Sequence, residues 1–131
     1  MSTRRGFLAL LFGLPAVPLA RTAPAREAPR YVLNDCFIAG FQYHEGPGLL
    51  GRLEVGTELS AVAEPGNPYD ERAVRLELWG KHLGYLPRDQ NRAVADLLAQ
   101  GAPVRCSITG LSESAPPWEA VRIQTTIAVV P

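Results

Sequence analysis

The two thiols of this 131-residue chain, Cys36 and Cys106, are the first residues to consider for chemistry. A structural zinc site needs four ligands at suitable spacings, whereas these cysteines lie 70 residues apart, with no Cys-x-x-Cys and no histidine pair near either. We therefore predict no metal site. In an oxidising compartment the thiols would pair if their strands were neighbours, and otherwise they are small buried apolar residues.

No pattern of residues typical of catalysis stands out. The sequence has no Ser–His–Asp or paired-carboxylate arrangement and no Gly-x-x-x-x-Gly-Lys-Ser/Thr phosphate-binding loop. The two histidines, His44 beside Glu45 and His82 in a predicted hairpin, are expected at the surface. The sequence thus predicts a protein that is not an enzyme and that needs no cofactor.

Residues 1–25 are typical of a removable export signal. A positive start precedes an apolar run from Phe7 to Ala20, and cleavage is predicted after Ala20 or Ala25. The run is short of the roughly 20 residues that a membrane-spanning helix needs. We expect a mature protein with no membrane span, in the periplasm or secreted.

Arg4 and Arg5, followed by Gly6, Phe7 and Leu8, resemble the twin-arginine export motif of bacteria. This resemblance implies the twin-arginine export machinery as a partner. An ordinary secretory signal that happens to carry two arginines, or an uncleaved anchor, is the alternative.

Charge excludes a protein that coats DNA through a broad basic face. The chain has 13 basic and 13 acidic residues, but three of the arginines lie within residues 1–25, so the mature module carries 10 basic and 13 acidic residues, a net charge of −3. Binding driven by the phosphate backbone needs a basic surface. A small local basic patch is still compatible with this balance.

Short apolar alternations from residue 35 onward predict a β-rich module, after a flexible leader at 26–34. Strands are predicted at 37–43, around 59–63, in a hairpin over 73–86 that turns at Gly80 and Lys81, at 104–108 and at 121–129. Helical spacing with Asp89 as N-cap and Gly101 as stop predicts one helix over about 89–100. Five or six strands with one or two helices indicate a mainly β fold, closed into a small barrel because closure removes exposed strand edges.

Three blocks between Phe37 and about Val129 resemble the HIRAN domain family. The strongest runs from Glu64 through Asp70 to Ala73 and Val74, the second is Leu83 to Arg88, and the third, weaker one is Ala39 to Tyr43. The resemblance implies a HIRAN-like domain over 35–131 with an OB-like barrel. It also implies a nucleic-acid-binding module, which in the best understood members, DNA-remodelling ATPases, captures the 3′ end of single-stranded DNA.

The resemblance also implies site residues. Tyr43 and Tyr69 match aromatic residues that contact the terminal nucleotide, Asp70 matches the acid that accepts a hydrogen bond from the 3′-hydroxyl, and Arg88 matches a phosphate-binding position. Asn67 lies in the same turn as Asp70 and is a candidate for sugar or phosphate contact.

Three departures and a structural alternative weaken the DNA assignment. Gln42 stands where the DNA-binding members have arginine, and His44 and Tyr85 each replace a different polar aromatic residue. The Asn67–Asp70 segment also has the composition of a turn that needs no ligand, and Arg88 that of a solvated residue at a helix start. The leading function is therefore recognition of single-stranded nucleic-acid ends. The alternative is an exported module that binds a protein or a small ligand on the same barrel.

Overall fold

A computed structural model of the chain describes residues 28–129. The predicted export signal over residues 1–25, with Arg4 and Arg5, lies outside these described residues. Within them, no helix is both long enough and apolar enough to cross a membrane.

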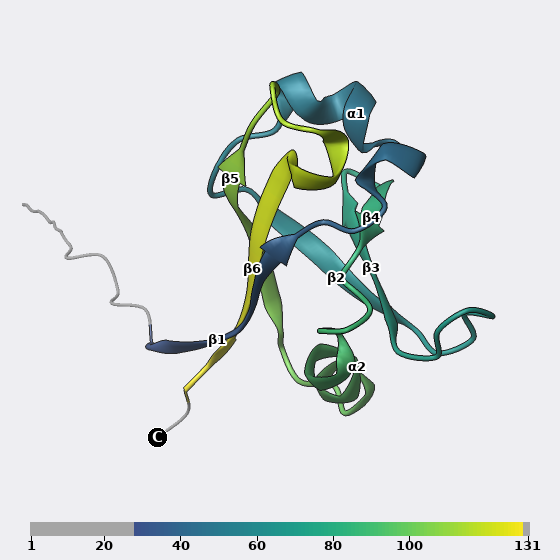
Figure 1. Ribbon diagram of the computed structural model, residues 1–131. Helices are drawn as coiled ribbons and strands as arrows, with labels where there is room; N and C mark the ends of the chain where they lie inside the picture. Colours follow the sequence, from purple (N-terminus) through teal and green to yellow (C-terminus); the bar gives the residue numbers. More distant parts are fainter. Residues whose placement is uncertain (1–27, 130–131) are drawn as a thin grey trace, which may run out of the picture.

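Six strands form one antiparallel sheet that curls into a small barrel (Figure 1). They are β1 (Arg30–Phe37), β2 (Glu58–Glu64), β3 (Ala73–Leu78), β4 (Lys81–Tyr85), β5 (Arg105–Leu111) and β6 (Val121–Ala128), in the order β1-β6-β5-β2-β3-β4. The two ends of this order meet just after β1, where the backbones of Ala39 and Tyr85 exchange hydrogen bonds of 2.8 and 2.9 Å. The predicted mainly β, barrel-like fold is confirmed.

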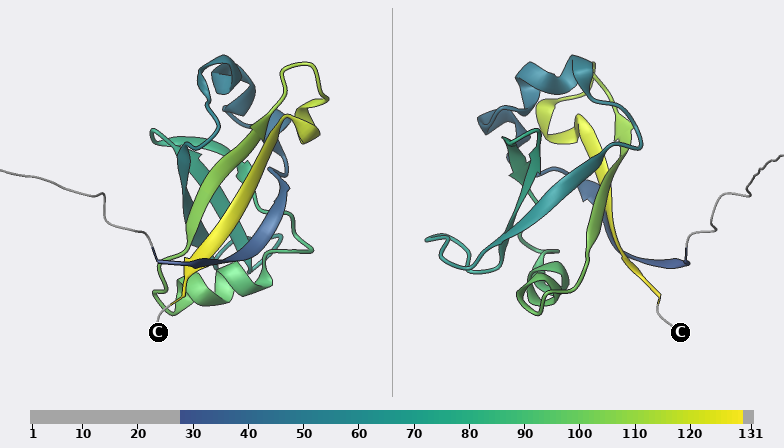
Figure 2. Two further views of the ribbon diagram at one scale, coloured as in Figure 1. Left: turned by 90° about the vertical axis from the view of Figure 1, so that its left-hand side faces the viewer. Right: turned by 180° about the vertical axis from the view of Figure 1, so that it is seen from behind.

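Short helices cover the two ends of the barrel. The longest, α2 (Arg92–Ala99), lies at one end, and α1 (Gly46–Leu49) lies at the other with the 3₁₀ turns η1 (Phe41–Tyr43), η2 (Leu50–Arg52) and η3 (Pro117–Glu119) (Figure 2). Strand alternation fills the interior, as in β3, where Val74, Leu76 and Leu78 are buried.

The start of the domain differs from the prediction. Residues 30–34, predicted as part of a flexible leader, begin β1, and the predicted strand at 37–43 ends at Phe37 and continues into η1. The alternation of apolar residues does not predict this part of the strand, because one of its inward-facing residues is polar. Buried Asn34 donates to the Gln90 carbonyl at 2.8 Å and accepts from the Thr125 hydroxyl at 2.8 Å.

The predicted hairpin over 73–86 is confirmed, with its turn at Trp79 and Gly80, one residue earlier than predicted. The helix begins at Arg92, not near Asp89, and Asn91 occupies the N-cap position. Its predicted stop is confirmed, because Gly101 adopts a φ of 79° directly after the last turn.

Cys36 and Cys106 lie on strands that are not neighbours. Cys36 pairs with Ile123 and Cys106 with Thr125, so β6 lies between them and their partners are two residues apart along it; the two strand spacings alone amount to about 9–10 Å. That distance exceeds the roughly 7 Å limit between the Cα atoms of a disulfide. Burial raises the pKa of the Cys36 thiol to about 11 and that of Cys106 to about 12, so both thiols stay protonated in the core.

Candidate functional site

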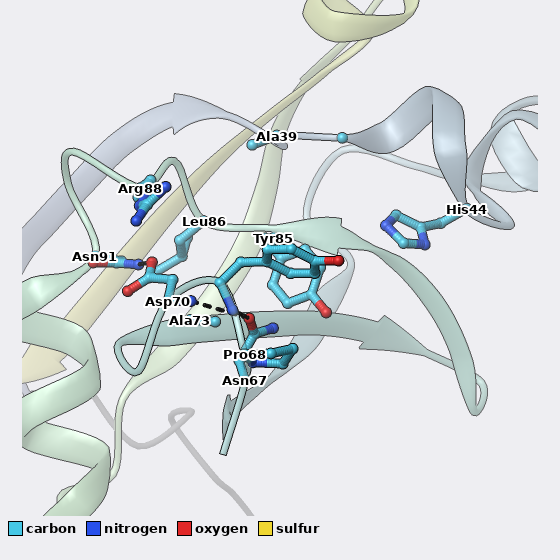
Figure 3. Close-up of a pocket in the computed structure, with 12 residues that line it drawn as sticks. Ala39, His44, Asn67, Pro68, Asp70, Ala73, Tyr85, Leu86, Arg88 and Asn91 are labelled. Carbon is cyan, nitrogen blue, oxygen red and sulfur yellow. Dashed lines mark hydrogen bonds between the residues drawn. The ribbon is translucent and has the colours of Figure 1, made fainter. Parts of the chain in front are cut away.

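A cavity of about 500 Å³ opens where the β2–β3 connection meets the end of β4 and the segment after β1 (Figure 3). Three stretches far apart in the sequence supply its walls, and the closing hydrogen bonds between Ala39 and Tyr85 hold two of them together. The lining residues are Ala39, Gly40, His44, Asn67, Pro68, Tyr69, Asp70, Ala73, Tyr85, Leu86, Arg88 and Asn91.

The β2–β3 connection is folded by the side chain of Asn67. Its Oδ1 accepts hydrogen bonds from the backbone N–H groups of Tyr69 at 2.9 Å and Asp70 at 3.1 Å, and its Nδ2 donates to Glu64 Oε1 at 3.0 Å. An Asn side chain that bonds its own backbone in this way replaces a backbone turn. The Asn67 amide therefore positions its neighbours, and Tyr69, which lines the cavity, is 83% exposed.

Asp70 is held by hydrogen bonds to both carboxylate oxygens. The Arg72 backbone N–H donates to Oδ1 at 2.9 Å, and Asn91 Nδ2 donates to Oδ2 at 2.8 Å. These two bonds, with smaller contributions from the charges of Arg88 and Arg72, hold the pKa of Asp70 below its ordinary value. The carboxylate is thus ionised at neutral pH, and each oxygen keeps a lone pair for a further donor.

Glu64, which does not itself line the cavity, anchors two residues that do. Glu64 Oε1 accepts from the Tyr85 hydroxyl at 2.9 Å, and Glu64 Oε2 lies 3.2 Å from Arg75. Desolvation raises the pKa of Glu64, but the bonds from Asn67 and Tyr85 and the charge of Arg75 outweigh it and lower the net pKa. Desolvation and the Glu64 contact raise the pKa of Tyr85, so its hydroxyl stays protonated. Glu64 therefore fixes the positions of Asn67 and Tyr85 together.

His44 and His82 pack as a stacked pair beside Tyr85. Their ring centroids are 3.8 Å apart, and Tyr85 presents its ring at a steep angle to both, with centroid distances of 5.8 and 4.9 Å. From the sequence both are expected at the surface; in the structure both residues are half-buried, and His44 lines the cavity. Desolvation, with the charges of His44 and Arg75, lowers the pKa of His82.

Arg88 is the cation of the cavity. It is exposed and lies close to Asp70 and Asn91 in Figure 3, yet it forms no ion pair within residues 28–129. An arginine without a carboxylate partner keeps its donors available for an anion.

Five of the seven sequence-predicted binding residues line this cavity: Asn67, Tyr69, Asp70, Tyr85 and Arg88. The other two do not: Tyr43 lies 79% exposed in η1, next to His44, and Gln42 is half-buried. Asn91, Glu64 and His44 were missed as site residues. Glu64 belongs to the same sequence block as Asp70, and His44 directly follows the block from Ala39 to Tyr43, at a position where the family has a different polar aromatic residue, whereas no local pattern marks Asn91.

The described residues contain no group of three or more His, Cys, Asp or Glu side chains placed to hold a metal ion. The cavity instead offers one fixed carboxylate, one unpaired arginine and exposed aromatic faces. This set can accept a hydrogen bond, bind an anion and stack a planar ring.

Comparison with known proteins identifies the family through a sequence model that covers most of the chain. The sequence model of the HIRAN domain matches residues 32–130. The crystal structure of a protein from Lactobacillus plantarum is 26% identical, with a TM-score of 0.62, covering 76% of this chain and 97% of that one. The HIRAN domain of human HLTF, known from a crystal structure, is 16% identical in sequence, with a TM-score of 0.59. The match covers 75% of this chain and 78% of that one. None of the curated proteins compared with the chain matches it.

Proposed function

The chain belongs to the HIRAN domain family, a family of nucleic-acid-binding modules, and on that premise we propose that its cavity binds the 3′ end of single-stranded DNA. One observation carries the proposal. A doubly anchored, ionised Asp70, an unpaired Arg88 and the exposed ring of Tyr69 line the same cavity. The proposed role is binding, without catalysis.

Asp70 is the residue proposed to recognise the 3′-hydroxyl of the nucleic acid. An ionised carboxylate accepts a hydrogen bond from a terminal hydroxyl and repels a terminal phosphate. Because the Arg72 backbone and Asn91 hold its two oxygens, the carboxylate needs no reorganisation when the hydroxyl arrives. Selectivity for a free 3′-hydroxyl follows from this chemistry.

Tyr69 and Arg88 are the proposed contacts to the rest of the terminal nucleotides. Stacking a base on an aromatic ring stabilises the complex by about 1–3 kcal/mol, whichever base it is, because every base has a π-face. In this proposal Arg88 donates to the phosphate that joins those nucleotides, because its guanidinium has no carboxylate partner among the described residues. Tyr43, exposed beside His44, is proposed to add an outer stacking face, and Gln42 contributes no charge there.

The experiment that tests the proposal is a titration of the protein with single-stranded oligonucleotides that carry a free, phosphorylated or blocked 3′ end. We expect the free hydroxyl end to bind most tightly. We also expect a shallow salt dependence, because few cations contact phosphates. Equal binding of hydroxyl and phosphate ends, or no binding at low salt, would contradict end recognition.

One observation favours a second candidate, an exported module for a protein or small ligand. The ionised carboxylate of Asp70 lines the cavity together with the uncharged polar side chains of Asn67, Tyr85 and Asn91, against Arg88, the single cation among the described residues that line it. This balance suits a ligand rich in hydroxyl or amino donors. A ligand of that kind that competes with the oligonucleotide, or binds where no oligonucleotide does, would favour the second candidate.

We further propose that the protein is exported through the twin-arginine route and acts in the periplasm or outside the cell. The support is the sequence Arg4-Arg5-Gly6-Phe7-Leu8 ahead of the apolar run. Changing both Arg4 and Arg5 to lysine keeps the charge but alters the group that a receptor reads, so export should stop. Cell fractionation with intact-mass analysis measures this. Unchanged export with cleavage after Ala20 or Ala25 would point to an ordinary secretory signal.

A further inference from the structure

Trp79 and Arg52 form an aromatic and cationic surface outside the cavity. Trp79 lies in the turn between β3 and β4 and is 59% exposed. The Arg52 guanidinium carbon lies 5.2 Å from the centroid of its ring, and Arg52 has no carboxylate partner in the part of the chain that the structure describes. An exposed indole beside an unpaired cation is suited to stacking a base next to its phosphate.

The backbone conformation at Trp79 is one that a tryptophan does not favour. Among the described residues, Trp79 is the one non-glycine with positive φ, at 54°, and Gly80 follows with a φ of 74°. A two-residue hairpin turn with positive φ at both positions prefers Asn-Gly, and a bulky residue in this region is strained. Strain that the fold does not require points to a role for the exposed ring.

Strand β4 connects this surface to the cavity. It follows the turn at Trp79 and ends at Tyr85, and the six residue steps from Trp79 to Tyr85 span at most about 20 Å. A stacked strand of nucleic acid rises about 3.4 Å per nucleotide, so roughly six nucleotides cover that distance. Single-strand sites on OB folds range from about 4 to 16 nucleotides, and the span falls within this range.

We propose that a single-stranded nucleic acid with its 3′ end in the cavity continues along β4 and stacks a base on Trp79, with Arg52 at the adjoining phosphate. The inference rests on the proposed function and extends it from a terminal pocket to a track. The same pair of features occurs at both ends of the track: an exposed aromatic ring and an arginine without a carboxylate partner, Tyr69 with Arg88 and Trp79 with Arg52.

Oligonucleotide length tests this track. The variant Trp118→Phe leaves Trp79 as the sole tryptophan of the chain, so its emission reports on that surface. Thymidine oligonucleotides of two and eight nucleotides with free 3′ ends are titrated at low salt, with affinity measured by calorimetry. We expect the dinucleotide to bind without changing Trp79 emission. The octanucleotide should quench the emission and bind at least about fivefold more tightly.

The variant Trp79→Asn separates binding from folding. It creates the Asn-Gly pair that this turn prefers, so the melting temperature should hold or rise. Octanucleotide affinity should fall about tenfold while dinucleotide affinity stays unchanged. Trp118→Asn is the matched control, because Trp118 is a similarly exposed tryptophan (56%) in η3, and it should alter neither affinity.

Each other outcome overturns part of the scheme in an identifiable way. Equal affinity for the two lengths, or an octanucleotide affinity that Trp79→Asn leaves unchanged, overturns the track and leaves the pocket intact. Octanucleotide binding that depends on Trp79 but ignores a 3′-phosphate supports the Trp79 surface and overturns end recognition. Failure of every oligonucleotide to bind overturns both proposals.

Discussion

Replacing Gly84 by alanine is expected to destabilise the barrel by at least about 3 kcal/mol, through backbone strain and overpacking together. Gly84 adopts a φ of 144°, which side chains rarely tolerate, at a bulge where β4 carries one more residue than β3. A Cβ there would lie 2.5 Å from the Ala39 carbonyl oxygen and 2.6 Å from Ile38 Cγ2. The clash falls on the residues that close the barrel, next to the Ala39–Tyr85 hydrogen bonds.

Thermal unfolding measures this loss. For a domain of this size, about 3 kcal/mol lowers the melting temperature by roughly 12–24 °C. Gly48→Ala is the matched control, since Gly48 is exposed in α1 and a Cβ there meets nothing within 4 Å. That variant should hold or raise the stability by up to about 1 kcal/mol, because alanine favours a helix over glycine. A Gly84→Ala protein that melts with the parent would show that the barrel does not close at Ala39 and Tyr85.

Replacing Asp70 by asparagine is expected to abolish the preference for a free 3′-hydroxyl over a 3′-phosphate. A hydrogen bond to a charged group is stronger than one to a neutral group, so the parent should discriminate roughly 10–100-fold. The asparagine has nearly the same shape, and its remaining oxygen can still accept from the Arg72 backbone. Asn91 can rotate its amide to accept from the new donor, so the fold should persist.

Competition between oligonucleotides with hydroxyl and phosphate ends measures the preference. Glu71→Gln is the control for charge, because Glu71 is an exposed carboxylate beside Asp70 that does not line the cavity. It removes the same charge and should leave the preference intact. Since the pKa of Asp70 lies below its ordinary value, its carboxylate stays ionised from pH 8 down to pH 5, and the preference should weaken only as the terminal phosphate takes up a proton near about pH 6. A parent and an Asp70→Asn variant with equal preference would remove Asp70 from end recognition.

The sequence by itself determined the features that depend on nearby residues. The turn at Asn67 folds through bonds to residues two and three positions further on, and Gly101 stops the helix within its own last turn. The hairpin of β3 and β4 likewise follows from local alternation and a tight turn. Each of these depends on contacts within a few residues, and such contacts leave a pattern of spacing that can be recognised in the sequence.

The tertiary structure alone decided the rest of the site. Asn91 anchors Asp70 and Glu64 anchors Tyr85 across 21 residues in each case, and His44 stacks on His82 from a different element. β1 was missed for a similar reason, because its inward Asn34 is satisfied by partners that are distant in sequence. Contacts of this kind follow from how the strands close into a barrel, and closure brings together residues whose spacing along the chain carries no period.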